Sequence, residues 1–207
     1  MAILTAVFAS ALLTALGVSL ALLGTGETTL AGRGCDTASA AYAARAALTL
    51  GVAELRLQPS WVGVLKPGSY PELSASPSQI VDTSLRPTAP WGAVLDVRVL
   101  TSQLQAETDA AGGVGDPMVW RLFAYGPIGR LVPAGPWTRH YLLVWVSDDR
   151  GDGDGDPSAD MNGSILIHAE ALGRDGTRAL VEATVRRTTP PGGGPDLVRL
   201  LTVGAKP

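Results

Sequence analysis

Cysteine is almost absent from this chain, because Cys35 is the only one among its 207 residues. A single cysteine cannot form an intrachain disulfide, which excludes the small secreted proteins that depend on a disulfide framework. We expect Cys35 to be a small apolar residue of a helix, with an intermolecular disulfide as the alternative. The formal net charge is only −3, and no cluster of Lys and Arg is interleaved with aromatic residues. We therefore expect no nucleic-acid partner.

Charged side chains are absent from the first 26 residues, and Glu27 is the first to appear. The run from Ala2 to Leu23 has the roughly 20 apolar residues that a helix needs to cross a bilayer. A cleaved signal peptide begins with basic residues and has a shorter apolar stretch. The sequence therefore predicts a retained transmembrane anchor over residues 1–25. Because orientation normally depends on basic flanking residues, we expect a short leader to precede Met1.

The apolar character continues through residues 26–57, which are rich in the helix formers Ala and Leu. Two apolar stripes follow the helical period. The first contains Ala41, Leu48, Val52 and Leu55, and the second contains Tyr42, Ala46, Leu50, Ala53 and Leu57. A helix that is apolar around most of its circumference packs on two sides, so we expect it to contact its own domain and something else. Pro59 ends the predicted helix.

Residues 58–90 are rich in proline and serine and are expected to form an irregular connecting region. Residues 91–207 instead alternate short apolar runs with turn signals such as the hairpin sequence Leu172–Gly176, which is typical of an antiparallel meander with one face covered. The predicted strands are 93–99, 118–125, 141–146, 165–171, 179–185 and 197–203. The expected fold class is α+β: a long N-terminal helix, transmembrane in its first half, packed on a C-terminal antiparallel sheet.

Residues 27–47 carry a resemblance to a known family. The segments 27–31 (ETTLA) and 42–47 (YAARAA), with Asp36 between them, are similar to the helix of PilX-type minor pilins, relatives of the type IV pilins and pseudopilins. The family usually has an acidic residue at the position of Arg45 and often a basic one at that of Cys35. The resemblance covers roughly residues 1–57 and implies a pilin-like fold.

The resemblance also implies a structural function rather than a catalytic one. It predicts a minor pilin-like subunit of a type IV pilus or related filament, which primes assembly or modulates adhesion. Its partners would be other pilin subunits, contacted through the N-terminal helix. The chain would cross the inner membrane once with its C-terminal domain in the periplasm, and after assembly would lie in an extracellular filament.

The acidic tract from Asp148 to Gly163 is the one cluster with the character of a metal site. Four aspartates match positions 1, 3, 5 and 9 of an EF-hand-like calcium loop: Asp152, Asp154, Asp156 and Asp160. However, Pro157 and Gly163 replace the glycine and glutamate that an EF-hand requires at positions 6 and 12. The tract therefore predicts either a looser calcium site with these four ligands or a solvated acidic turn between two strands.

The sequence has no G-x-S-x-G, H-E-x-x-H, C-x-x-C or P-loop pattern, and we expect no enzymatic activity. We expect His168 to be a packed or surface residue of a strand, and Glu170 and Glu182 could face each other across a hairpin. Two other functions stay open. One is a membrane-tethered periplasmic binding module that does not polymerise. The other is a membrane-anchored hydrolase, which would need a pocket that holds both His140 and Glu170.

Overall fold

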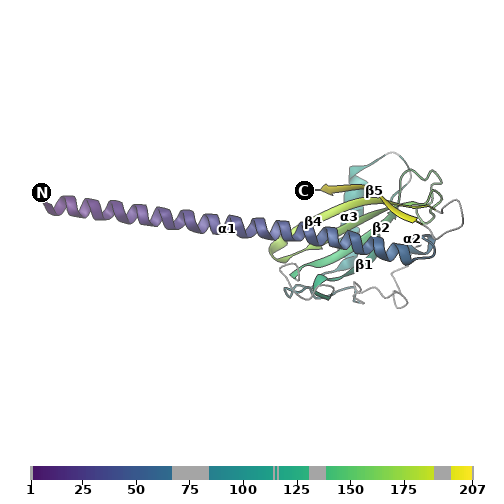
Figure 1. Ribbon diagram of the computed structural model, residues 1–207, viewed down its shortest axis with the longest axis horizontal. Coiled ribbons are helices and arrows are strands. Elements are labelled where there is room, and N and C mark those ends of the chain that lie inside the picture. Colours follow the sequence, from purple (N-terminus) through teal and green to yellow (C-terminus); the bar gives the residue numbers. More distant parts are fainter. Residues whose placement is uncertain are drawn as a thin grey trace. The chain divides into compact units, whose positions relative to one another are not determined.

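The computed structural model describes residues 2–66, 84–113, 115, 117–130, 139–188 and 197–206. The chain divides into two units, Met1–Ala38 and Ser39–Pro207. Helix α1 runs from Ala2 to Leu57 and belongs to both (Figure 1). The elements that follow are α2 (Val62–Leu65), α3 (Val97–Ala111), β1 (Arg121–Pro127), the 3-10 turn η2 (Ile128–Arg130), β2 (Tyr141–Asp148), β3 (Ser164–Leu172), the 3-10 turn η4 (Arg174–Gly176), β4 (Arg178–Thr188) and β5 (Leu197–Lys206).

The first unit is helical at every residue that is described, and all of these side chains are exposed. Its apolar segment could cross a membrane by length and composition. The hydroxyls of Ser10 and Thr14 donate hydrogen bonds to the carbonyls of Val7 (2.9 Å) and Ser10 (2.8 Å), so both polar groups are satisfied within the helix. Cys35 is exposed on α1. The predicted continuous helix up to Leu57 is confirmed.

The five strands form one antiparallel sheet in the order β1-β2-β3-β4-β5, so each strand pairs with the next along the chain. This confirms the predicted meander, and β2 to β5 lie where the sequence placed them with slightly longer bounds. β1 begins three residues later than predicted. The cause is Gln105 of α3, whose side chain donates to the carbonyl of Met118 and accepts from the amide of Trp120, both at 2.9 Å.

The strand predicted at 93–99 is wrong, because this segment leads into α3. Asp96 is the N-cap, and its Oδ1 accepts from the backbone amides of Arg98 and Val99, both at 3.2 Å. These bonds satisfy two of the amides that a helix leaves unpaired at its first turn. The alternation of AVLDVRV is also compatible with a strand. The N-cap and the helix-forming residues that follow Val99 together favour the helix over a strand.

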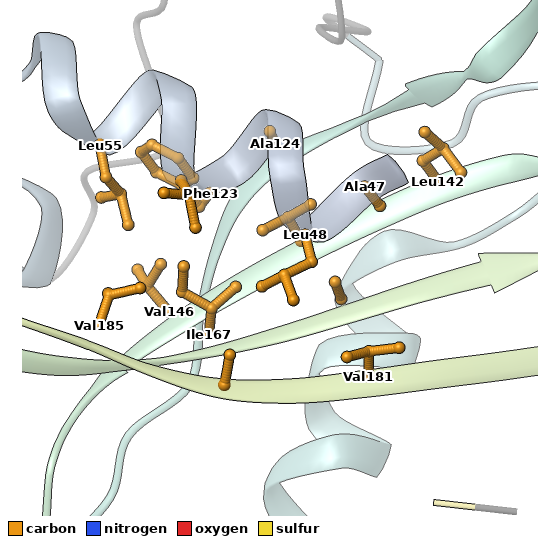
Figure 2. Packing of buried hydrophobic residues seen from close by; sticks show 14 of the residues in the cluster. Ala47, Leu48, Leu55, Phe123, Ala124, Leu142, Val146, Ile167, Val181 and Val185 are labelled. Atoms are coloured by element: carbon orange, nitrogen blue, oxygen red, sulfur yellow. The ribbon is translucent and has the colours of Figure 1, made fainter. Parts of the chain in front are cut away.

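The part of α1 after Ala38 covers one face of the sheet (Figure 2). Leu48, Val52 and Leu55, which belong to the first predicted stripe, are buried in the same cluster as Val144 and Ile167. The helix approaches the sheet closely at Gly51, where a Cβ atom would lie 2.9 Å from Cγ1 of Val144. The interaction of this half of the helix with the sheet, which the sequence predicts, is confirmed.

The second predicted stripe of α1 is covered only in part. Ala46 and Leu50 are half-buried against the same cluster. Tyr42 and Leu57 are 63% and 62% exposed. The stripe therefore leaves apolar surface uncovered among the described residues of the chain.

The opposite face of the sheet also carries an apolar cluster, which α3 covers with Val97 and Leu104. β2 shows the arrangement best, because all eight of its residues are buried. Leu142, Val144 and Val146 belong to the cluster beneath α1, whereas Tyr141, Leu143 and Trp145 belong to the one beneath α3. The sequence predicted one covered face. The second is covered because the segment predicted as the first strand is a helix.

An arginine of β4 holds the C-terminal end of α1. The Arg187 guanidinium donates to the carbonyls of Gln58 (2.6 Å), Pro59 (3.2 Å) and Leu55 (3.3 Å), and lies 4.6 Å from the centre of the Trp61 ring. A cation at this end satisfies carbonyls that the helix leaves unpaired. Part of the predicted irregular connection over 58–90, residues 67–83, lies outside the described residues.

Candidate functional site

The acidic tract forms the connection between β2 and β3, from the last residue of one strand, Asp148, to the first of the next, Ser164. Gly153 and Gly155 adopt positive φ angles of 77° and 73°, which glycine accepts without steric cost. The resulting turns bring Asp148, Asp152 and Asp154 together, with one carboxylate oxygen from each within 4.8 Å of the others.

Asp148 is the most deeply placed of these three carboxylates, with only 1% of the residue exposed. Its Oδ1 accepts from the amide of Asp149 at 3.0 Å, whereas its Oδ2 is buried and has no hydrogen-bond partner among the described residues. Burial, supported by the nearby charges of Asp152, Asp149 and Asp160, raises the pKa of Asp148 to about 7.

The other two members of this cluster also keep an oxygen for a ligand. Asp152 accepts from the amide of Met161 through Oδ2 at 2.7 Å, and its Oδ1 is buried without a partner among the described residues. Asp154, which is exposed, accepts from the amide of Asp156 at 2.8 Å. In the described part of the chain, no Lys or Arg forms an ion pair with any of the three.

Asp156 and Asp160, the other two predicted ligands, lie elsewhere in the connection and bond to its backbone and hydroxyl groups. Asp156 accepts from the hydroxyl and the amide of Ser158, and these bonds lower its pKa. Asp160 accepts from the amides of Gly163 (2.7 Å) and Ser164 (3.0 Å), while its partial burial raises its pKa. Both residues therefore fix the shape of the loop.

The structure thus brings together two of the four predicted ligands, Asp152 and Asp154, and adds Asp148. Sequence reasoning placed Asp148 inside the acidic tract but not among the ligands. The signal that could have identified it is the apolar strand sequence YLLVWVSD. This strand extends to Asp148, and all of its residues are buried. The cluster has the character of a site for a hard cation, because all its ligand atoms are carboxylate oxygens.

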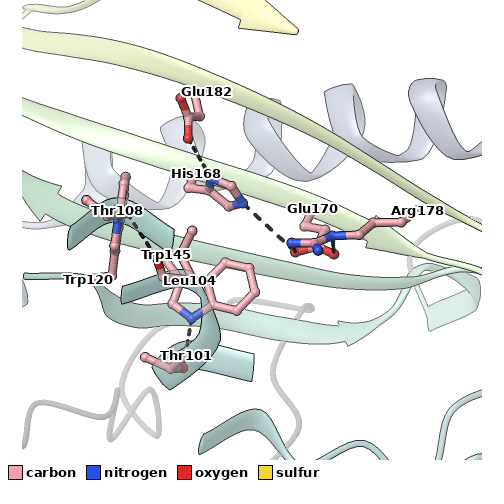
Figure 3. Close-up of polar contacts among 9 residues, drawn as sticks. All are labelled: Thr101, Leu104, Thr108, Trp120, Trp145, His168, Glu170, Arg178 and Glu182. Carbon is pink, nitrogen blue, oxygen red and sulfur yellow. Dashed lines mark hydrogen bonds and ion pairs between the residues drawn. The ribbon is translucent and has the colours of Figure 1, made fainter. Parts of the chain in front are cut away.

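A second polar cluster surrounds His168 of β3 (Figure 3). His168 is buried, with Nδ1 2.9 Å from Oε1 of Glu182 and Nε2 3.9 Å from Oε2 of Glu170. Arg178 forms an ion pair with Glu170 in turn. Burial alone would lower the pKa of His168, but the hydrogen bond to Glu182 and the negative charges of Glu170 and Glu182 outweigh it and raise the pKa.

This cluster also connects the sheet to α3. The rings of Trp120 and Trp145 meet the His168 ring edge-on, with centroids 5.6 and 5.5 Å away. The two indole N–H groups donate to the hydroxyls of Thr108 (2.7 Å) and Thr101 (2.9 Å) on α3. His168 is therefore a packed residue of the strand, as the first of the two sequence interpretations has it. Glu182 is its cross-strand partner, whereas Glu170 pairs with Leu180.

A cavity of about 450 Å³ lies beside this cluster, between α3 and β4. Its lining includes Glu107 and Leu104 of α3, His168 of β3, and Glu182 of β4. Neither His140 nor Glu170 lines it, so it is not the pocket that the hydrolase interpretation requires. Comparison with known proteins adds no further assignment: no protein-family model, no curated protein and no solved structure matches the chain.

Proposed function

We propose that this protein is a minor pilin-like structural subunit of a type IV pilus or related filament, in which it primes assembly or modulates adhesion. One observation carries the proposal, namely the division of α1. Residues 2–26 are uncharged and exposed, whereas the turns from Ala40 to Leu55 belong to the core of the sheet domain. The resemblance of residues 27–47 to PilX-type minor pilins supports the same function.

The physical basis is that a lipid bilayer and the interior of a helical filament are both apolar. Transfer from one to the other leaves side chains such as Phe8 and Leu12 out of water, so little hydrophobic free energy is lost. The hydroxyls of Ser10 and Thr14 are bonded to the helix itself and need no new partner in either environment. Before assembly, the chain would span the inner membrane once with its sheet domain in the periplasm.

The second candidate is a membrane-tethered periplasmic binding module that does not polymerise. The cavity between α3 and β4 favours it, because its mixture of apolar walls and charged side chains is typical of a small-molecule site. The two candidates share the membrane anchor and differ in whether the chain leaves it.

Charge substitution within the anchor separates the two candidates. Leu13→Glu would place a carboxylate in a dry helix bundle, where it has no partner, so we expect at least tenfold depletion from sheared filaments. Wild type and the apolar control Leu13→Ile should both be incorporated. One charge at a helix centre costs about 2.5–3.5 kcal/mol for insertion, so the variant should remain in the membrane fraction.

The amounts are measured by immunoblotting the sheared filament and membrane fractions from the same cells. Normal incorporation of Leu13→Glu would contradict the filament proposal. Wild type confined to the membrane fraction would favour the tethered module. A sequence upstream of Met1 that encodes a short basic leader ending in Gly would independently support the pilin-like subunit.

A further inference from the structure

We propose that Asp148, Asp152 and Asp154 bind one calcium ion at the end of β2. The site does not depend on the filament function, since it is built entirely from residues between β2 and β3. The three carboxylates converge within 4.8 Å. Two oxygens on opposite sides of one calcium ion lie about 5 Å apart, because each calcium–oxygen distance is about 2.3–2.6 Å. The oxygens therefore fit around one ion without rearrangement of the backbone.

The strongest support comes from two buried oxygens that have no donor. Oδ2 of Asp148, on a residue that is 1% exposed, and Oδ1 of Asp152 both lack a hydrogen-bond partner among the described residues. A buried carboxylate oxygen is normally paired, because its desolvation is otherwise uncompensated. Asp148 belongs to the convergent cluster, and because its Oδ1 already accepts from the amide of Asp149, Oδ2 is the oxygen left free for a cation. An acidic turn that is merely solvated would not bury one of its carboxylates.

The identity of the ion follows from the donor set. The cluster supplies carboxylate oxygens alone, which suits a hard cation rather than zinc or copper. Calcium takes six to eight oxygens and tolerates irregular geometry, and backbone carbonyls or water complete its shell. Magnesium requires a near-ideal octahedron and gives up its water reluctantly, which a deeply buried Asp148 does not suit.

Asp156 and Asp160 have a different role in this proposal. Their oxygens hold the backbone of the loop through Ser158, Gly163 and Ser164. They position the ligands without binding the ion. The ligand set is thus shifted toward β2 relative to the one that EF-hand-like spacing predicts.

The test is calcium titration of the full chain in detergent, after metal has been removed with a chelator. We expect one calcium ion per chain by isothermal titration calorimetry, and a rise in Tm as calcium chloride is added. Asp154→Asn is the main variant, since an exposed side chain can be changed without threatening the fold. It should weaken calcium binding tenfold or more, because affinity depends on the number of charged ligands.

Asp148→Asn keeps the shape of the buried side chain and should abolish the calcium-dependent rise in Tm. The matched control is Asp175→Asn, in the β3–β4 turn, where φ is 59° and asparagine is tolerated. This control should bind calcium like wild type. Absence of binding by wild type at millimolar calcium would overturn the proposal, as would full affinity in both Asp148→Asn and Asp154→Asn. An equal rise in Tm with magnesium chloride would overturn the calcium assignment.

Discussion

At the scale of single residues, Gly51 is where α1 and the sheet come closest. A Cβ atom there would lie 2.9 Å from Cγ1 of Val144, whose β-branched side chain has little freedom to move. Gly51→Val should therefore lower the free energy of unfolding by about 1–3 kcal/mol through overpacking. Ala53→Val, on an exposed position two residues later, is the matched control. Urea unfolding followed by tryptophan fluorescence measures both, and equal stability of the two variants would contradict the close approach.

His168 makes the stability of the fold depend on pH. Its pKa is raised in the folded state by Glu170 and Glu182. The protonated ring therefore contributes stability that is fully present below its unfolded pKa of about 6.5. This contribution is lost as the pH rises through the raised folded pKa. The Tm should accordingly fall on the alkaline side of pH 6.5.

His168→Gln can keep a hydrogen bond to Glu182 but does not titrate, so it should reduce the slope of this part of the pH profile and leave the part that Asp148, with its pKa of about 7, contributes. The same substitution at His140 serves as the control and should preserve the slope. Thermal unfolding between pH 6.5 and 9 measures the effect. A wild-type slope retained in His168→Gln would show that another group is responsible.

At the scale of elements, α3 depends on its N-cap. Asp96→Ala removes the oxygen that accepts from the amides of Arg98 and Val99. We expect a loss of about 1 kcal/mol in the free energy of unfolding. Asp96→Asn retains an accepting oxygen and should be nearly neutral. Hydrogen exchange should show faster exchange in the first turn of α3 for the alanine variant alone, and unchanged exchange there would contradict the capping role.

The elements also show where sequence reasoning succeeds. The meander was predictable because alternating apolar residues and Gly- or Asp-rich turns are local signals, and β2 to β5 follow them. The failure at 93–99 has a local cause as well, since Asp96 before a helical spacing of apolar residues is a capping signal that competes with strand alternation. The later start of β1 could not be predicted from the neighbouring sequence, because it depends on a hydrogen bond from Gln105, which lies 13 residues before Met118.

The candidate metal site was predictable only in part. The spacing of aspartates identified the loop that holds the convergent carboxylates and two of the three residues in that cluster. It could not show which carboxylates bond to the loop's own backbone, as Asp160 does with Gly163 and Ser164. Nor could it show the burial of Asp148, which depends on packing around the end of β2. The His168 cluster has no sequence pattern, because its members come from two strands and its aromatic neighbours from further segments.

At the scale of the whole molecule, the two units should behave differently toward a membrane. The uncharged segment of α1 lies in Met1–Ala38, whereas the sheet lies in Ser39–Pro207. We expect the full chain to remain in the membrane pellet after alkaline carbonate extraction, because about 20 apolar residues are held in lipid. A chain that begins at Ser39 should be released. Release of the full chain would contradict the anchor, whatever the outcome of the filament experiment.

Arg187 has a mechanical consequence for any state in which α1 bears tension. Its guanidinium donates hydrogen bonds to the carbonyls of Leu55, Gln58 and Pro59, and its backbone amide donates to the carbonyl of Gly163 at 2.7 Å. A pull along the helix axis would therefore reach β4 directly through this side chain, in addition to the apolar contacts beneath α1. The same residue would transmit part of that load to Gly163, immediately before β3, so β3 and β4 would resist the pull together.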